Sequence, residues 1–240
     1  MFVIVLLNLG FIASASIPIL LAPALSFNTA LSMTVLFAGI VWCFIYASAL
    51  SRCIMKFSDY SRFDFGDLLR SIKPAIPAGV IGGIMVFFLF LLVTLVIPFY
   101  LNFESIWGIL LSALIFWTLV IGVLSLQFFI TIAARLDPRI VKAVKKCFLI
   151  FFDNTGFCVF SFFHNLVLLI ISALTAFLIP GPAGIFLYLD EALRLRLMKY
   201  DWLEAHPGEG RRIPWDALLI DERDKTGTRS FRNFIFPWKD

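Results

Sequence analysis

The sequence predicts an all-α membrane protein with six transmembrane helices, two cytosolic amphipathic surface helices and a short cytosolic C-terminal tail. Three observations predict this fold class. The chain of 240 residues is 61% hydrophobic and only 15% charged, whereas about a quarter of the residues in a soluble domain are charged. Its apolar runs reach about 20 residues, the length that a helix needs to cross a bilayer. Its Lys and Arg residues all fall in three blocks between or after these runs.

The three basic blocks predict the topology of the chain. They cover residues 52–73, 135–146 and 194–239. The connections Leu25–Asn28, Leu101–Ser105 and Pro180–Pro182 hold no basic residue. Lys and Arg beside membrane-spanning helices stay on the cytoplasmic side, because they resist translocation and meet anionic lipid there. We therefore expect both termini in the cytoplasm and these three connections outside.

The first four apolar runs predict four spans. They are Phe2–Pro23, Thr29–Leu50, Ala78–Tyr100 and Ile106–Ala134. Only a short turn, Ser26-Phe27-Asn28, separates the first two, so these should form a helical hairpin. The first run has no basic leader and is followed at once by another apolar run, which indicates a retained span and not a cleaved signal peptide. Asn8 in the first span and Gln127 in the fourth are expected to form hydrogen bonds between helices.

Two further spans are predicted, Gly156–Ile179 and Ala183 to about Tyr200. The sixth is the least apolar, but without it the basic tail would lie outside, against the charge rule. Together the six spans make a transmembrane bundle over residues 1–200. Residues 201–240 change sharply in composition and predict a basic and aromatic cytosolic tail, too short to form a core of its own.

The two inner connections are predicted to be amphipathic helices that lie on the membrane surface. In Arg62–Lys73 the apolar residues that share a face are Phe65, Leu68, Leu69 and Ile72. In Pro138–Asp153 they are Ile140, Val144, Cys147, Phe148 and Phe151. A period of 3.6 residues places the charged residues on the opposite side, so each helix should turn its apolar face to the membrane and its basic face to water.

Five polar residues in the last two spans form the candidate site: His164, Asn165, Asp190, Glu191 and Arg194. Ionisable side chains at membrane depth are costly and often functional, so one hypothesis is a ligand or proton site inside the bundle. The alternative is structural. Arg194 then pairs with Asp190 or Glu191 about one turn away, while the side chains of His164 and Asn165 form hydrogen bonds between helices.

Sequence signals for enzymes, cofactors and metals are missing. The chain has no phosphate-binding loop, no HExxH motif and no nucleophile elbow. Its four cysteines lack metal-ligand spacing, and none lies on a predicted external connection. The basic residues flank apolar spans and do not form a groove for phosphates, so nucleic acid is not an expected partner. We expect a non-enzymatic protein without cofactor or metal, whose main partner is the lipid bilayer.

Several segments resemble the YesL-type family of small bacterial membrane proteins of unknown function. Asn8, Pro18 and Pro23-Ala24 are similar to the opening of that family's first span, and Phe65–Lys73 is similar to its first surface helix. Ala134–Gly156 resembles the second surface helix with its Asn-x-Gly exit, and Arg194–Tyr200 resembles the basic exit ending in Tyr. The likeness covers roughly Asn8–Tyr200. The chain departs from the pattern because it lacks the usual cytosolic lead-in and adds an aromatic tail.

The resemblance implies a multi-pass protein of the bacterial plasma membrane, of a kind sometimes found alongside carbohydrate ABC-transport systems. It supplies no catalytic residue. Two functions stay open: an accessory or regulatory partner of a transport system, and a small-molecule transporter whose site is formed by the five polar residues. A transporter needs these groups to converge on a cavity that water can reach, whereas an accessory protein can bury them in pairs.

Overall fold

The computed structural model describes residues 2–61, 64–103, 105–207 and 213–226. These residues form helices and turns with no strand among them, which confirms the all-α class. Five helical segments are long and apolar enough to cross a membrane, so the chain is a membrane protein. The chain divides into two compact units, residues 1–193 and residues 194–240. The aromatic end of the predicted tail lies outside the described residues.

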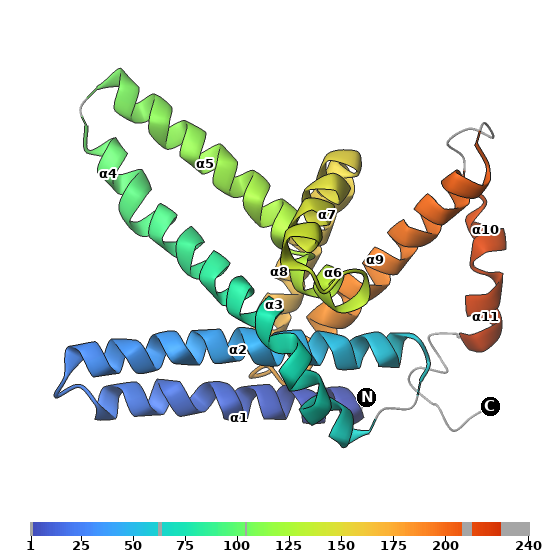
Figure 1. Cartoon of the computed structure of the whole chain (residues 1–240), viewed down its shortest axis with the longest axis horizontal. Helices are drawn as coiled ribbons and strands as arrows, with labels where there is room; N and C mark the ends of the chain where they lie inside the picture. Colours follow the sequence, from blue (N-terminus) through green and yellow to red (C-terminus); the bar gives the residue numbers. More distant parts are fainter. Residues whose placement is uncertain (1, 62–63, 104, 208–212, 227–240) are drawn as a thin grey trace. The chain divides into compact units, whose positions relative to one another are not determined.

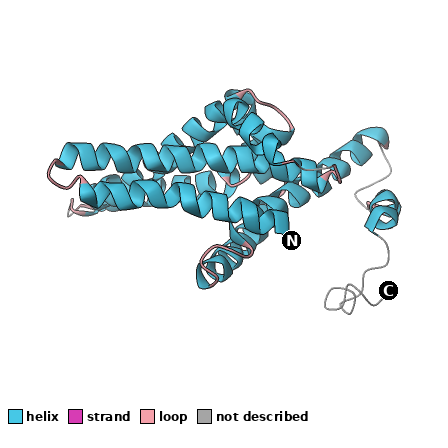
Figure 2. Cartoon of the chain, turned by 90° about the horizontal axis from the view of Figure 1, so that it is seen from below, coloured by secondary structure: helices cyan, strands magenta, loops and turns pink. Residues whose placement is uncertain are grey.

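Helices α1 and α2 form the predicted hairpin. They span Phe2–Ala24 and Thr29–Ser58. Figures 1 and 2 show them side by side and antiparallel. Asn28 is the N-cap of α2, because its side chain accepts a hydrogen bond from the Leu31 amide at 3.2 Å. Further along the hairpin the Tyr46 hydroxyl donates to the Leu7 carbonyl oxygen at 2.9 Å, which fixes the register between the two helices.

The third candidate span is one continuous helical segment. It consists of α3 (Phe65–Leu91), the π-helical turn η1 (Leu92–Val96) and α4 (Ile97–Leu101). The surface helix predicted over Arg62–Lys73 is therefore not a separate element, since its described part forms the start of α3. The helix continues through Pro74 and Pro77, although each proline removes a backbone donor.

Small residues let α3 approach α2 closely. A Cβ on Gly79 would stand 2.4 Å from Ile45 Cα, and one on Gly83 would stand 3.4 Å from Val41 Cα. Both glycines therefore face the α2 backbone, in the GxxxG spacing that the sequence shows. Membrane helices associate largely through such close packing, because lipid is as apolar as the side chains and gives no hydrophobic drive.

Helices α5 and α6 together make the fourth candidate span. They cover Ile106–Leu126 and Phe129–Arg135. A break at Gln127 and Phe128 interrupts what the sequence predicted as a single helix. Helix α5 returns antiparallel to α3–α4, and this second hairpin diverges from the α1–α2 hairpin (Figure 1).

Helix α7 (Ile140–Asp153) is present as a separate element where the second surface helix was predicted. Its buried residues are Ala143, Cys147, Ile150 and Phe151. The buried face is thus packed against protein, and burial raises the pKa of the Cys147 thiol to about 12. Just before α7, the Arg139 amide donates to Asp137 Oδ1 at 3.1 Å, and together with nearby Lys side chains this lowers the pKa of Asp137.

Helices α8 and α9 complete the first unit, and α9 continues into the second. They span Thr155–Leu174 and Gly181–Ala205. Helix α8 is the fifth candidate span, whereas α9 is not among the segments apolar enough to cross, so the sixth span is not confirmed. The reason is composition, because Asp190, Glu191, Arg194 and Arg196 interrupt its apolar residues. The second unit also holds the short helices α10 (Trp215–Leu218) and α11 (Ile220–Thr226).

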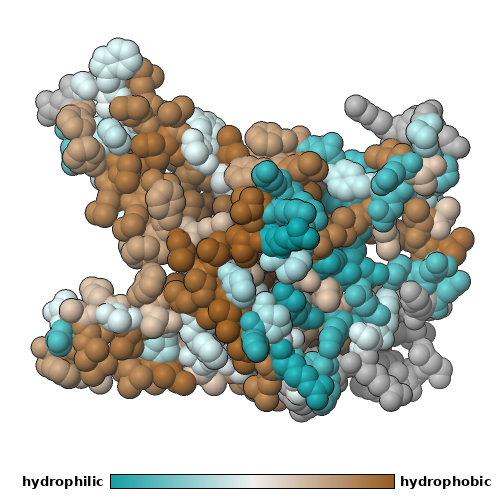
Figure 3. All heavy atoms as spheres, in the orientation of Figure 1, coloured by the Kyte–Doolittle hydropathy of each residue, from teal (hydrophilic) through white to brown (hydrophobic). Residues whose placement is uncertain are grey.

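The surface of the two hairpins is apolar. In the most apolar 18-residue stretch of each candidate span, only 11–17% of the residues are buried, so most of these side chains are at least partly exposed. Figure 3 shows hydrophobic residues over the ends of the hairpins that carry the α1–α2 and α4–α5 turns, while hydrophilic residues gather around α7 and the end of α2. This distribution fits lipid around the hairpins and water at the other end.

Candidate functional site

Asp190 is the centre of a charged cluster where three helical segments meet. Its side chain is 1% exposed. Arg135, the last residue of α6, holds both carboxylate oxygens: Nε donates to Oδ1 at 2.7 Å, and Nη2 donates to Oδ2 at 2.6 Å. The same Nη2 donates to Oδ1 of Asp59, directly after α2, at 3.1 Å. One guanidinium therefore joins the ends of α2 and α6 to α9.

The structural alternative allowed Arg194 to pair with Asp190 or with Glu191 on the same helix, and the partner found for Asp190 is a different one. The structure pairs Asp190 with Arg135 instead, because packing brings the end of α6 against α9. The planar guanidinium matches a carboxylate with two parallel hydrogen bonds, so one arginine can satisfy a buried aspartate. The cluster lies level with the end of α2 and thus at the border of the bundle.

Glu191 and Arg194 have other partners. The Ser58 hydroxyl, at the end of α2, donates to Glu191 Oε1 at 2.5 Å. Arg194 belongs to the second unit, where its Nη2 donates to Glu222 Oε1 of α11 at 2.7 Å. The three charged residues of the predicted site are thus each engaged by a partner that sequence spacing did not indicate.

His164 and Asn165 are neighbours on α8 with different surroundings. The His164 ring stacks on Tyr188 of α9, with ring centroids 3.9 Å apart and an interplanar angle of 25°. The Tyr188 hydroxyl in turn donates to Ser161 Oγ at 3.2 Å. Within the part of the chain that the structure describes, the buried atoms His164 Nδ1 and Asn165 Oδ1 have no hydrogen-bond partner. Of the five predicted residues, only Asn165 lines the cavity described next.

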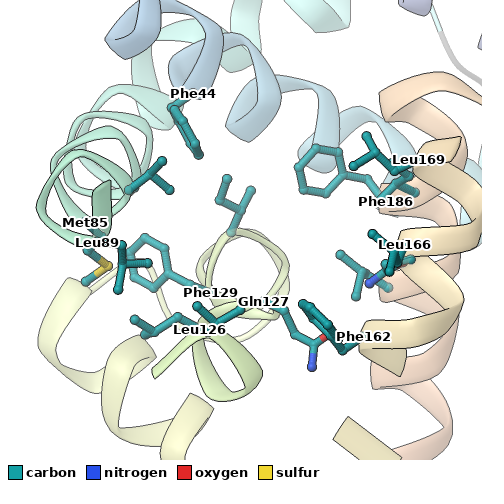
Figure 4. Close-up of a pocket in the computed structure, with 17 residues that line it drawn as sticks. Phe44, Met85, Leu89, Leu126, Gln127, Phe129, Phe162, Leu166, Leu169 and Phe186 are labelled. Atoms are coloured by element: carbon teal, nitrogen blue, oxygen red, sulfur yellow. The ribbon is translucent and has the colours of Figure 1, made fainter. Parts of the chain in front are cut away.

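An apolar cavity of about 400 Å³ lies between six helices (Figure 4). Helices α2, α3, α5, α6, α8 and α9 contribute to its walls. Its lining residues are apolar except for Gln127, at the break between α5 and α6, and Asn165. In Figure 4 the Gln127 side chain extends toward the α8 wall, where Phe162 and Leu166 lie. The cavity offers a ligand a hydrocarbon surface with two amide groups and no charge.

Asn8 of α1 binds the turn between α8 and α9. Its side chain is fully buried. Nδ2 donates to the carbonyl oxygens of Leu178 at 2.9 Å and Pro180 at 2.8 Å, and Oδ1 accepts from the Ala183 amide at 2.9 Å. Both N–H groups and the oxygen of the Asn8 amide thus form hydrogen bonds with the backbone of this one connection. The sequence suggested a hydrogen-bonding role for Asn8 but not this partner.

Other polar groups in the same turn are also paired. The Gly181 amide donates to Ser172 Oγ at 3.0 Å, and the Thr175 hydroxyl donates to the Ile179 carbonyl oxygen at 2.5 Å. Gly181 has a φ of +61°, and a Cβ there would stand 2.3 Å from Asn8 Nδ2, so the position requires glycine. Non-helical backbone at membrane depth needs such internal partners, because lipid offers none.

The described residues contain no group of three or more His, Cys, Asp or Glu side chains that could hold a metal ion. The four cysteines are free thiols. Comparisons with protein-family models, with curated proteins and with solved structures found no match for this chain. The YesL-type resemblance therefore stays a prediction.

Proposed function

We propose that this chain is a non-catalytic membrane protein that acts as an accessory or regulatory partner of a transport system. The Arg135–Asp190 pair is the observation that carries the proposal. A carrier that used Asp190 would need this carboxylate open to its substrate, whereas Asp190 is closed off by a bidentate arginine. The large cavity is apolar and none of the three charged residues lines it, which favours the partner role over the transporter alternative.

We also propose a topology in which α8 and α9 form a re-entrant hairpin, in place of the six crossings that the sequence predicted. Two lengths support this arrangement. Asn8, which binds the α8–α9 turn, lies 16 residues before Ala24, or about 24 Å of helical rise from the α1–α2 turn. The second length is that of α9 from Gly181 to the charged cluster at Asp190. These nine residues rise by about 14 Å, which is less than half of the roughly 30 Å thickness of the hydrocarbon core.

The exposed side chains of the α8–α9 turn support the same arrangement. The large ones are apolar: Leu174, the last residue of α8, is 83% exposed, and Ile179, Phe177 and Leu178 are exposed as well. Thr175 is also exposed, but its hydroxyl donates to a carbonyl oxygen within the turn. An apolar tip whose backbone groups are paired internally suits hydrocarbon better than the outer aqueous surface.

A re-entrant hairpin also satisfies the charge rule without a sixth span. The crossings would be α1, α2, α3–α4 and α5–α6, and this even number returns the chain to its starting side. All three basic blocks and both termini are then cytoplasmic. With the resemblance to bacterial membrane proteins, this gives the proposed localisation: a multi-pass protein of the bacterial plasma membrane.

The transporter alternative can be tested with the purified chain in liposomes of phosphatidylethanolamine and phosphatidylglycerol. We expect no uptake of radiolabelled glucose or maltose and no proton flux above that of empty liposomes, because the charged residues are held in pairs. In cells, deletion of the gene should lower the uptake of a carbohydrate by a separate transporter. Flux by the purified chain that Asp190→Asn abolishes, while Arg139→Ala leaves it intact, would establish a carrier and overturn the proposal.

A further inference from the structure

We infer that the cavity lined by Gln127 and Asn165 binds a membrane-soluble alcohol, with its hydrocarbon body against the apolar walls and its hydroxyl donating to Gln127. This goes beyond the proposed partner role, which needs no ligand. The inference rests on one buried hydrogen-bond acceptor, which belongs to a residue of the cavity wall, and on the composition and size of the cavity.

Gln127 presents an unpartnered acceptor because its amide nitrogen is already engaged. Nε2 donates to the carbonyl oxygens of Leu124 and Cys158, both at 2.8 Å. The buried Oε1 has no hydrogen-bond partner among the described residues. Turning the amide over would place its oxygen against two carbonyl oxygens, so the acceptor role of Oε1 is set by the fold. A buried acceptor without a partner is destabilising, and a ligand that donates a hydrogen bond there would relieve this cost.

The break between α5 and α6 explains why a glutamine stands here. Ending α5 leaves carbonyl groups without helical partners, and at membrane depth they must be satisfied from within the protein. Gln127 Nε2 supplies the donor for Leu124 and, in addition, joins α5 to α8 through Cys158. Its nitrogen therefore has a structural role, whereas its oxygen has none.

Water is a poor occupant of this cavity. A buried water needs two to four polar partners, and a volume of about 400 Å³ would require many waters. The side chains that line it offer only two amides, and Asn165 is the second. The volume lies instead within the range of about 300–1,000 Å³ that is typical of small-molecule sites with apolar walls and few polar groups.

The acceptor selects among membrane-soluble molecules. A plain acyl chain would fill the cavity but leave Gln127 Oε1 unpaired. A ketone, ester or ether would bring only a further hydrogen-bond acceptor. An anionic headgroup would find no cation among the lining residues. A hydroxyl on a linear or branched hydrocarbon supplies the missing donor. Asn165 can present either end of its amide to the hydroxyl oxygen or to a second polar group.

Photolabelling of the full chain in phosphatidylcholine nanodiscs tests this inference. The probe is 1-dodecanol with a mid-chain diazirine, and mass spectrometry locates the labelled residues. We expect labels on Met85, Leu89 and Leu166 of the cavity wall. Unlabelled dodecanol should compete about tenfold better than dodecyl methyl ether, because the ether lacks the donor that Gln127 accepts.

A matched pair of variants separates the cavity from the lipid surface. Met85→Trp fills the cavity and should abolish these labels, whereas Leu114→Trp, which is 66% exposed on α5, should leave them unchanged. If Met85→Trp does not fold, Leu89→Phe serves the same purpose. Labelling that survives cavity filling, or equal competition by the ether and the alcohol, would overturn the inference and leave the cavity filled by lipid tails only.

Discussion

Replacing Arg135 by Ala should lower the free energy of unfolding by about 3–5 kcal/mol, because it leaves the buried Asp190 carboxylate without a partner. The loss is large since one guanidinium makes both hydrogen bonds to Asp190 and a third to Asp59. The measurement is an SDS-unfolding titration of the full chain in mixed micelles, followed by circular dichroism.

Two comparisons make this result specific to the buried pair. Arg139→Ala removes an arginine four residues further along the chain, whose side chain is 75% exposed, and should cost less than about 1 kcal/mol. The double variant Arg135→Gln with Asp190→Asn removes both charges and should recover much of the loss. Equal effects of Arg135→Ala and Arg139→Ala would contradict the buried ion pair.

Replacing Asn8 by Leu should lower the free energy of unfolding by about 3 kcal/mol or more. The apolar side chain leaves the carbonyl oxygens of Leu178 and Pro180 and the Ala183 amide without partners, and each buried polar group costs about 1–3 kcal/mol. The same SDS titration measures it.

Asn28→Leu is the control for Asn8→Leu, because it removes the same side chain from the other turn. Asn28 is exposed and makes one N-cap hydrogen bond, so its loss should cost about 0.5–2 kcal/mol. If Asn8→Leu costs no more than Asn28→Leu, the α8–α9 turn is not held by Asn8.

Hydropathy was enough to predict most of the spans. The predicted bounds of the first span agree with those of α1 to within one residue, because a polar turn follows the apolar run. The start of α3 was missed, since Lys73, Pro74 and Pro77 suggested an end where the helix in fact continues along α2. The break at Gln127 was also missed, because an uninterrupted apolar composition gives no sign of it.

The candidate site shows where sequence reasoning stops. Spacing along one helix can only propose partners three or four residues away, which is why Arg194 was the partner expected for Asp190 or Glu191. Its partner Arg135 is 55 residues distant, and Asn8 is 170 residues or more from the turn that it binds. Such contacts depend on how helices pack, which spacing along one helix does not show.

The re-entrant α8–α9 hairpin is the central claim, and depth measurement by electron paramagnetic resonance tests it most directly. Single spin labels go on Phe27→Cys and Ile179→Cys in a cysteine-free background in liposomes, and collision with oxygen and with a nickel chelate reports depth. The six-span prediction puts both residues at the outer surface. The re-entrant hairpin predicts that Phe27 is accessible to the nickel chelate, whereas Ile179 is accessible to oxygen alone. Equal nickel accessibility at the two positions would contradict it.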